Sequence, residues 1–168
     1  MLSSQPTDEP PAADPADVDS IDAIVNALYA SVSFAAGQRP DWARFCSLFE
    51  PRALMVRIDP RVTAQPASLR EEAPFRVSAV NDYVTRTTAA IDSGALRAFT
   101  ERELSRRTEV FGDLAQVFSA YERSADAGEA VRGINSMQLV KDGERWWIVA
   151  LSWTDETERG PLPNRYLR

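Results

Sequence analysis

The amino-acid sequence predicts an α+β half-cone, in which about three N-terminal helices pack on a curved, mostly antiparallel sheet. Two observations predict this architecture. Apolar residues recur at helical spacing through much of the first half of the chain. Two hairpin patterns then follow one another between Phe99 and Trp153, each with strand-like alternation on both sides of a turn that contains glycine. Helices followed by a run of strands are typical of a sheet that is covered on one face.

The length and composition indicate a single globular domain. The chain has 168 residues, of which 44% are hydrophobic, and this is enough for one core. The formal net charge of −6 argues against a nucleic-acid partner or an anionic membrane surface, since both need a basic face on the protein. We therefore expect neither partner.

The cysteine count and the hydropathy pattern indicate a cytoplasmic protein. Cys46 is the single cysteine, so the chain has no intrachain disulfide and no thiolate metal site. No apolar run approaches the ~20 residues of a membrane span, and the N-terminal residues lack the order of a signal peptide. No metal or phosphate-loop motif is present, and we expect no metal and no cofactor.

The N-terminal half is predicted to contain a tail, helices and one strand. Residues 1–17 are rich in proline and acids, and we expect them to form a disordered tail ahead of one domain at residues 18–168. Helical periodicity runs from Ser20 to near Gly37, resumes after Asp41 until Pro51, and returns over residues 79–92 behind Ser78 as the N-cap. Residues 52–58 alternate like a strand, whereas residues 59–76 fit a long loop or an irregular edge hairpin because they carry three prolines.

The first hairpin is predicted to turn at Gly112-Asp113, where glycine in the first position fits a type II′ turn. This turn sets a register in which two faces alternate. The inward face is then expected to carry Leu104, Arg106, Thr108, Val110, Ala115, Val117, Ser119 and Tyr121. Acidic residues are expected to point away from the core, at Glu101, Glu103, Glu109 and Glu122.

The second hairpin is predicted to turn at Asp142-Gly143, with a register open by one residue because Lys141 and Glu144 can also belong to the loop. In one register, the inward face carries Gly133, Asn135, Met137, Leu139, Trp147, Val149, Leu151 and Trp153. The other face then carries Arg132, Ile134, Ser136, Gln138, Val140, Trp146, Ile148 and Ser152. Both faces are poor in charge, which is typical of a sheet that helices cover on one side and that dimerises through the other.

The order of these elements resembles the nuclear transport factor 2-like superfamily, a cystatin-like α+β cone that includes the SnoaL-like and ketosteroid isomerase-like proteins. A closer resemblance, to a bacterial branch of the superfamily without an established reaction, covers about residues 19–167. It rests on the segments DWARFCSLFEPRALMVRI, FTERELSRRTEVFGDLAQVFSAYE, RGINSMQL, KDGERWWIVALSW and PLPNRYL. The resemblance implies a pocket between the concave face of the sheet and the helices, and a homodimer through the other face.

The resemblance does not supply a reaction, because a fold alone does not determine function. A histidine and aspartate pair often performs dehydration in this superfamily, and the chain has no histidine. Ketosteroid isomerase combines an acidic base with a tyrosine and a protonated acid, and its relatives that hydrolyse epoxides use two aspartates bridged by an arginine. No residues here match either motif, since the glutamates of the strands are expected to face outward.

Arg106 is the sharpest candidate for a ligand contact. It lies beside Ser119 and near Tyr121 on the inward face, where its guanidinium would meet the anionic or carbonyl end of a ligand. The alternatives are a structural ion pair with a helix acid, or a side chain that reaches water at the rim. Tyr121 and Tyr83 can donate hydrogen bonds into the pocket, although a tyrosine on such a face is more often simply core.

The other pocket candidates are Ser119, an asparagine and a set of aromatic residues. Asn135 lies among inward apolar residues and must be hydrogen-bonded, to backbone or water if not to a ligand. Trp153 and Trp147 from the sheet would line or fill the cavity, and Trp42 and Phe45 would close it from the helix side.

Two features outside the pocket indicate protein contacts. On the outer face, Arg132, Ser136 and Gln138 are expected to form hydrogen bonds across a homodimer interface. Residues 155–168 are expected to form an extended strap that docks on its own subunit or on its neighbour, with disorder as the alternative.

The leading hypothesis is a pocket protein that binds a small, largely apolar molecule, with its reaction left open. One alternative is a non-catalytic dimeric accessory or protein-interaction domain. Another is a histidine-free isomerase or hydrolase of the ketosteroid isomerase type, which would need an inward carboxylate of raised pKa. Of the acids, we expect those on the helices to be able to reach the pocket, at Asp41, Asp82 and Asp92.

Overall fold

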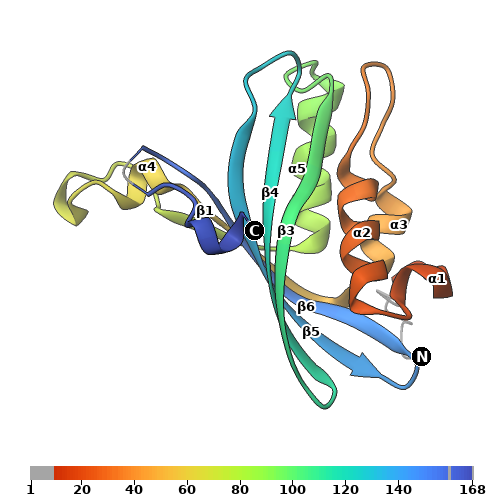
Figure 1. The fold of residues 1–168 in the computed structure, drawn as a ribbon. Coiled ribbons are helices and arrows are strands. Elements are labelled where there is room, and N and C mark those ends of the chain that lie inside the picture. Colours follow the sequence, from red (N-terminus) through yellow and green to blue (C-terminus); the bar gives the residue numbers. More distant parts are fainter. Residues whose placement is uncertain (1–9, 159, 168) are drawn as a thin grey trace, which may run out of the picture.

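The protein is built on one curved sheet of six strands in the order β2-β1-β6-β5-β4-β3, in a computed structural model that describes residues 10–158 and 160–167 (Figure 1). The strands are β1 (Phe49–Ile58), β2 (Phe75–Ala79), β3 (Phe99–Phe111), β4 (Leu114–Ala125), β5 (Val131–Asp142) and β6 (Arg145–Asp155). Neighbouring strands are antiparallel except β1 and β6, which are parallel. The predicted α+β half-cone with a mostly antiparallel sheet is therefore confirmed.

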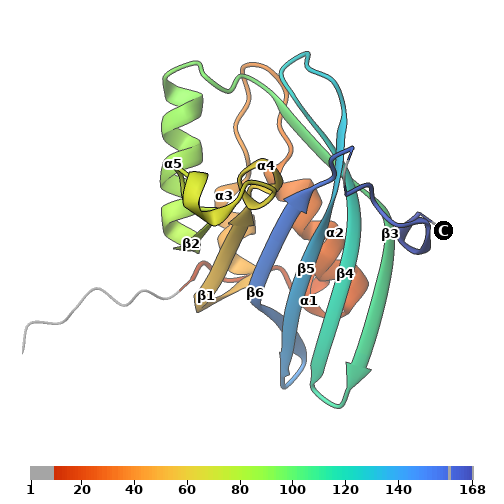
Figure 2. The same ribbon diagram turned by 90° about the vertical axis from the view of Figure 1, so that its left-hand side faces the viewer.

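Three helices cover one face of this sheet, and Figure 2 views the opposite, outer face with the helices behind it. They are α2 (Ile21–Val32), α3 (Trp42–Ser47) and α5 (Val80–Asp92), and they correspond to the three predicted helices. The side chains of Ser20 and Asp41 cap α2 and α3 by accepting hydrogen bonds from backbone N–H groups at 3.1 and 3.0 Å. The prediction that Ser78 caps the third helix is wrong, because Ser78 belongs to β2 and pairs with Met55 in the sheet.

The predicted disordered tail is partly ordered. Helix α1 (Pro15–Val18) begins with Asp14 as its N-cap, and Val18 is buried in the core. Asp17 forms an ion pair with Arg44 of α3 at 2.7 Å. These contacts order a stretch whose composition alone predicts disorder. The prediction for residues 1–9 lies outside the described residues.

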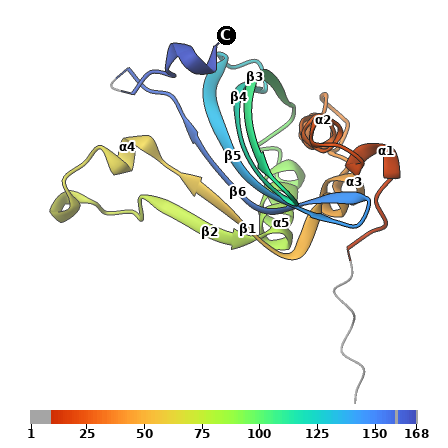
Figure 3. The same ribbon diagram turned by 60° about the horizontal axis from the view of Figure 1, so that its bottom comes forward.

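The proline-rich stretch at residues 59–76 is an edge hairpin with a long connection, one of the two predicted alternatives. It contains a short helix, α4 (Pro60–Thr63), and a single 3₁₀ turn at Ala67–Leu69. Its last residues enter β2, which pairs with β1 from Ile58 opposite Phe75. Figure 3 shows this connection projecting away from α2 and α3.

The first hairpin follows its predicted register only near the turn. Phe111 pairs with Leu114, and Gly112 has a φ of 58°, as the first central position of a type II′ turn requires. Further along, the pairing shifts at Leu104, which has no partner in β4. A bulge of this kind moves every residue beyond it to the opposite face of the strand.

The bulge at Leu104 overturns the predicted orientation of two glutamates. Glu103 pairs with Tyr121 and Glu101 pairs with Arg123, so both share the inward face of Tyr121. Our prediction that they point away from the core is therefore wrong. Glu122 does lie on the outer face, opposite Arg102.

The second hairpin contains a similar bulge. Its turn is Gly143-Glu144, one residue later than predicted, because Asp142 pairs with Arg145. The pairing shifts at Val149, and Trp146 and Ile148 are consequently buried on the inward face instead of Trp147 and Val149. Trp147 does not line the cavity, and its ring lies under the guanidinium of Arg145, 3.3 Å from the ring centroid.

The described part of the C-terminal segment, residues 156–158 and 160–167, lies against the outer face of its own subunit (Figure 2). Ser105 and Arg107 of β3 donate hydrogen bonds to the carbonyl oxygens of Tyr166 and Arg165. The ring of Tyr166 lies 5.9 Å from that of Phe118 on β4. Among the described residues, no helix has both the length and the apolar character that crossing a membrane requires.

Candidate functional site

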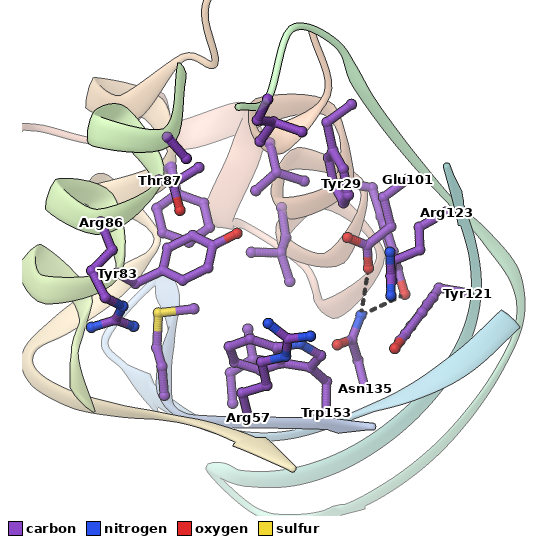
Figure 4. Close-up of a pocket in the computed structure, with 18 of the residues that line it drawn as sticks. Tyr29, Arg57, Tyr83, Arg86, Thr87, Glu101, Tyr121, Arg123, Asn135 and Trp153 are labelled. Atoms are coloured by element: carbon purple, nitrogen blue, oxygen red, sulfur yellow. Dashed lines mark hydrogen bonds between the residues drawn. The ribbon is translucent and has the colours of Figure 1, made fainter. Parts of the chain in front are cut away.

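A cavity of about 330 Å³ lies between the inward face of the sheet and helices α2, α3 and α5 (Figure 4). Most of its wall is apolar, including Leu28, Val32, Phe34, Phe45, Met55, Phe99 and Leu151. Tyr83 of α5 joins the two sides of the cavity, because its ring stacks on Phe45 at 5.6 Å and meets Trp153 edge-on at 5.9 Å. A small, largely apolar molecule suits such a wall.

Six of the nine predicted pocket residues line this cavity: Trp42, Phe45, Tyr83, Tyr121, Asn135 and Trp153. The three others, Arg106, Ser119 and Trp147, do not. The guanidinium of Arg106 donates to Asp22 at 2.7 Å and to Glu103 at 2.7 Å, and only 15% of its side chain is exposed. Arg106 therefore has the structural role that we weighed as its alternative, a bridge between β3 and the start of α2.

Ser119 lies behind the cavity wall, in a chain of buried hydrogen bonds. Its hydroxyl bonds to Tyr29 of α2 at 2.7 Å and donates to Glu103 at 2.5 Å. The amide nitrogen of Asn135 donates to the Tyr29 hydroxyl and to Glu101, both at 3.1 Å. The amide nitrogen of Asn135 is thus engaged with two protein groups, and it holds the Glu101 carboxylate in place.

Glu101 is the most unusual residue at this site, because it presents a carboxylate to a largely apolar cavity. Within the described residues, it forms no ion pair at 4.0 Å or less, and its side-chain hydrogen bond comes from the neutral amide of Asn135. Burial raises the pKa of Glu101 to about 7, although Asn135 and the charge of Arg123 act against this shift. The carboxyl group is therefore poised between its acid and base forms near neutral pH.

A second carboxylate nearby is held in the opposite state. Asp155 accepts two hydrogen bonds from Arg123, at 2.9 and 2.5 Å, and one from the Tyr121 hydroxyl at 2.8 Å. Burial acts to raise the pKa of Asp155, but these donors outweigh it and hold the pKa below its ordinary value. Asp155 is therefore ionised at neutral pH. Its ion pair with Arg123 lines the same cavity as Glu101.

Tyr83 faces Glu101 across the cavity, and its hydroxyl points into the open space (Figure 4). Burial and the charge of Glu101 raise the pKa of Tyr83 to about 12. Its hydroxyl consequently stays protonated at neutral pH, as a hydrogen-bond donor. An acid–base group and a fixed donor on opposite walls can act on the two ends of one polarised group in a bound molecule.

The helix acids that we expected near the pocket do not line it. Asp41 and Asp82 accept hydrogen bonds from backbone N–H groups at helix starts, and Asp92 forms an ion pair with Arg39 at 2.6 Å. The described residues contain no group of three or more histidine, cysteine, aspartate or glutamate side chains that could hold a metal ion.

Sequence reasoning missed Glu101, Arg123 and Asp155. The alternation that placed Tyr121 inward also places Arg123 inward, two residues along β4, so this signal was present. Asp155 follows Trp153 by the same rule. Glu101 could not be found in this way, since the bulge at Leu104 reverses its face.

No family model and no curated protein matches the sequence. Several solved structures match the fold. A nuclear transport factor 2-like superfamily protein from Salmonella enterica superposes with a TM-score of 0.56 at 16% identity, over 81% of this chain and 88% of the other. A protein from Shewanella frigidimarina, named as a candidate ketosteroid isomerase, gives 0.54 at 14% identity, over 85% of this chain and 99% of the other. A third, from Novosphingobium aromaticivorans and named as a candidate aromatic ring hydroxylase, gives 0.56 at 12% identity, over 82% and 87%.

These matches agree with the geometry of the curved sheet, the helix layer and the cavity between them. At this level of identity they concern the fold, and a fold alone does not determine function. The chain has the α+β cone fold of the nuclear transport factor 2-like superfamily.

Proposed function

We propose that the protein binds a small, largely apolar carbonyl compound in its cavity and that Glu101 transfers a proton on it, as in an isomerase. The observation that carries this proposal is the Glu101 carboxylate, which faces an apolar cavity with a pKa raised to about 7. A base with this pKa is half deprotonated at neutral pH and accepts a proton from carbon far better than an ordinary carboxylate. A carboxylate of this kind is what the histidine-free isomerase hypothesis required.

Each surrounding group has a role in this reaction. Glu101 would take a proton from the carbon next to the carbonyl group, and return it to another carbon of the same molecule. The Tyr83 hydroxyl, on the opposite wall, would donate a hydrogen bond to the carbonyl oxygen as negative charge develops there. Asn135 would hold the carboxylate, and the apolar wall would exclude water.

A hydrolase in which an arginine bridges two carboxylates is less well supported. Two carboxylates and an arginine do line the cavity, at Glu101, Asp155 and Arg123. However, Arg123 forms ion pairs with Asp155 alone among the described residues. An activated water between the two carboxylates would need Arg123 to hold both of them.

The proposal is tested by hydrogen exchange of 2-tetralone, a small apolar ketone with acidic α-hydrogens, followed by NMR in D₂O. We expect the wild-type protein to accelerate the exchange, with a rate that rises as pH increases through about 7 and then levels off. Glu101→Gln should lower the rate by at least about a hundredfold, because the amide cannot accept the proton. Glu109→Gln is the matched control, since Glu109 is an exposed glutamate on the same strand, away from the cavity. An equal rate in wild type and Glu101→Gln would exclude the proposal.

A second proposal concerns assembly. We infer that two copies of the chain associate through the outer face of the sheet. This rests on three apolar residues that are exposed there, Leu114, Phe118 and Val140. Of the residues predicted at this interface, Gln138 is exposed, whereas Arg132 and Ser136 are engaged within the subunit, with Glu156 and Gln116.

A further inference from the structure

The rim of the cavity carries exposed positive charge, although most of the cavity wall is apolar. Three of the residues that line the cavity are exposed to solvent, and all three are arginines: Arg57, Arg76 and Arg86. Every other described lining residue is buried or half-buried. The opening of the cavity is therefore positively charged, in a protein whose formal net charge is −6.

These arginines line the cavity from three different elements. Arg57 of β1 pairs directly with Arg76 of β2 on one side and with Trp153 of β6 on the other. Arg86 comes from α5 (Figure 4), and its guanidinium donates at 3.2 Å to Ser78 of β2, two residues along the strand from Arg76. The charges of Arg57 and Arg86 both act on the Tyr83 hydroxyl, and Arg57 acts on Asp155 as well.

No acidic side chain within the described residues forms an ion pair with any of the three. The arginine deeper in the cavity, Arg123, differs because it is already paired with Asp155. Two like charges directly opposite each other on neighbouring strands destabilise a sheet. Arg57 and Arg76 have this arrangement, so the fold bears a cost that a bound anion would offset.

We propose that Arg57, Arg76 and Arg86 bind the anionic end of an amphipathic ligand, whose apolar body enters the cavity. The ligand class is an oxyanion, carboxylate or phosphate, on an aliphatic or aromatic body. This inference rests on the proposed function in so far as both place the ligand in one cavity. It names the end of the molecule that stays at the rim, while Glu101 and Tyr83 face the body of the ligand.

Several guanidinium groups around one oxyanion form charge-assisted hydrogen bonds, which are stronger than neutral ones. Arginine is suited to this role because its planar fork matches the geometry of carboxylates and phosphates. Since the three arginines are exposed, salt screens their attraction for an anion. Binding of the anion should therefore weaken as the salt concentration rises.

The test compares ligands that differ only in their polar end. Octanoate, octyl phosphate and 1-octanol share one apolar chain, and their dissociation constants are measured by calorimetry at low and at high salt. We expect the wild-type protein to bind octanoate or octyl phosphate at least about tenfold more tightly than 1-octanol. The preference should shrink at high salt. Whichever of the two anions binds more tightly identifies the oxyanion.

The variants Arg57→Gln, Arg76→Gln and Arg86→Gln, alone and combined, locate the effect. The triple variant should bind the anions and 1-octanol equally well, while its affinity for 1-octanol stays that of the wild type. Arg52→Gln is the control, because it removes the same charge from the same strand at a side chain that is 92% exposed and does not line the cavity. The triple variant should be at least as stable as the wild type, since the substitutions relieve like-charge repulsion.

The two proposals fail in different ways. If 1-octanol binds as tightly as octanoate and octyl phosphate to the wild type, the arginine rim has no role in recognition, and the apolar cavity still stands as a ligand site. A triple variant that keeps the preference for the anions also overturns the inference. If none of the three compounds binds, both the rim and the cavity are excluded as sites for such a ligand.

Discussion

At the scale of single residues, Glu101 places opposite demands on stability and chemistry. A carboxylate that ionises near neutral pH is useful as a base, but the fold gains nothing from its charge. The group titrates at 4.5 when it is fully hydrated and at about 7 in the cavity, so burial disfavours its ionised form. The site therefore keeps a destabilising residue where a glutamine would satisfy the same hydrogen bond from Asn135.

This conflict predicts a pH dependence of stability. Between pH 4.5 and about 7 the folded protein holds a proton on Glu101 that the unfolded chain has released. The free energy of unfolding should therefore fall as pH rises through this window, by up to about 3 kcal/mol. Glu101→Gln cannot ionise, so its stability relative to the wild type should increase over the same window. Urea denaturation of both proteins from about pH 4 to about pH 8 measures the difference.

Other groups do not disturb this comparison. Asp155 has a lowered pKa, which contributes stability that is lost at acidic pH, but it does so equally in both proteins. Glu109→Gln removes an exposed carboxylate from the same strand, and its stability difference from the wild type should not change with pH. A flat difference for Glu101→Gln would mean that Glu101 ionises as an ordinary glutamate does.

At the scale of elements, the two hairpins show what the sequence can predict and what it cannot. The first turn and the pairs nearest it follow from glycine chemistry and alternation, as Arg106 opposite Ser119 confirms. A bulge needs no special residue, and neither Leu104 nor Val149 differs from its neighbours in a way that alternation can detect. Each bulge reverses one half of a strand. Because the bulge at Leu104 was not predicted, Glu101 was assigned to the wrong face. Because the bulge at Val149 was not predicted, Trp147 was placed on the inward face in place of Trp146 and Ile148.

The helices and part of the site could be predicted for the same reason, namely that their signals are local in the sequence. Periodicity and caps located α2, α3 and α5 because these signals depend on nearby residues. Pairing across long distances in sequence, such as Arg57 with Arg76 or Asp17 with Arg44, leaves no local signal. The aromatic part of the cavity was therefore predictable, whereas its charged rim and its acid depended on tertiary contacts.

Gly133 of β5 lies where the strands leave no room for a side chain next to Tyr121. A Cβ atom at this position would lie 2.3 Å from the Tyr121 hydroxyl and 2.4 Å from the carbonyl oxygen of Thr154. The carbonyl oxygen belongs to the neighbouring strand and cannot move without breaking the ladder. Gly133→Ala should lower the free energy of unfolding by about 2 kcal/mol or more, and displace Tyr121 from Asp155.

Gly160→Ala provides the matched control for urea denaturation, because the nearest atom to its Cβ would be at an ordinary 3.6 Å. It should leave stability within about 0.5 kcal/mol of the wild type. Equal stability of Gly133→Ala and the wild type would show that β5 and β6 can separate at this point without cost.

At the scale of the whole molecule, the outer face of the sheet has a surface that a single copy does not cover. Leu114 and Val140 pair across β4 and β5 and are 47% and 37% exposed, although the residues beside them, Ala115 and Leu139, are fully buried on the inward face. The C-terminal segment covers only the part of this face near Phe118 and β3. Exposed apolar residues that cluster on one face favour contact with another protein surface.

The proposed homodimer can be tested by size-exclusion chromatography with light scattering. We expect the wild-type protein to have twice its chain mass of 18.7 kDa and to dissociate only on dilution. Leu114→Asp places a charge on the exposed apolar part of the proposed interface and should give a mass of 18.7 kDa at the same concentration. Leu69→Asp is the control, since Leu69 is 68% exposed in the connection between β1 and β2, and it should stay dimeric. A wild-type protein that is monomeric up to its solubility limit would leave the outer face free for a different protein, and would revive the accessory-domain hypothesis.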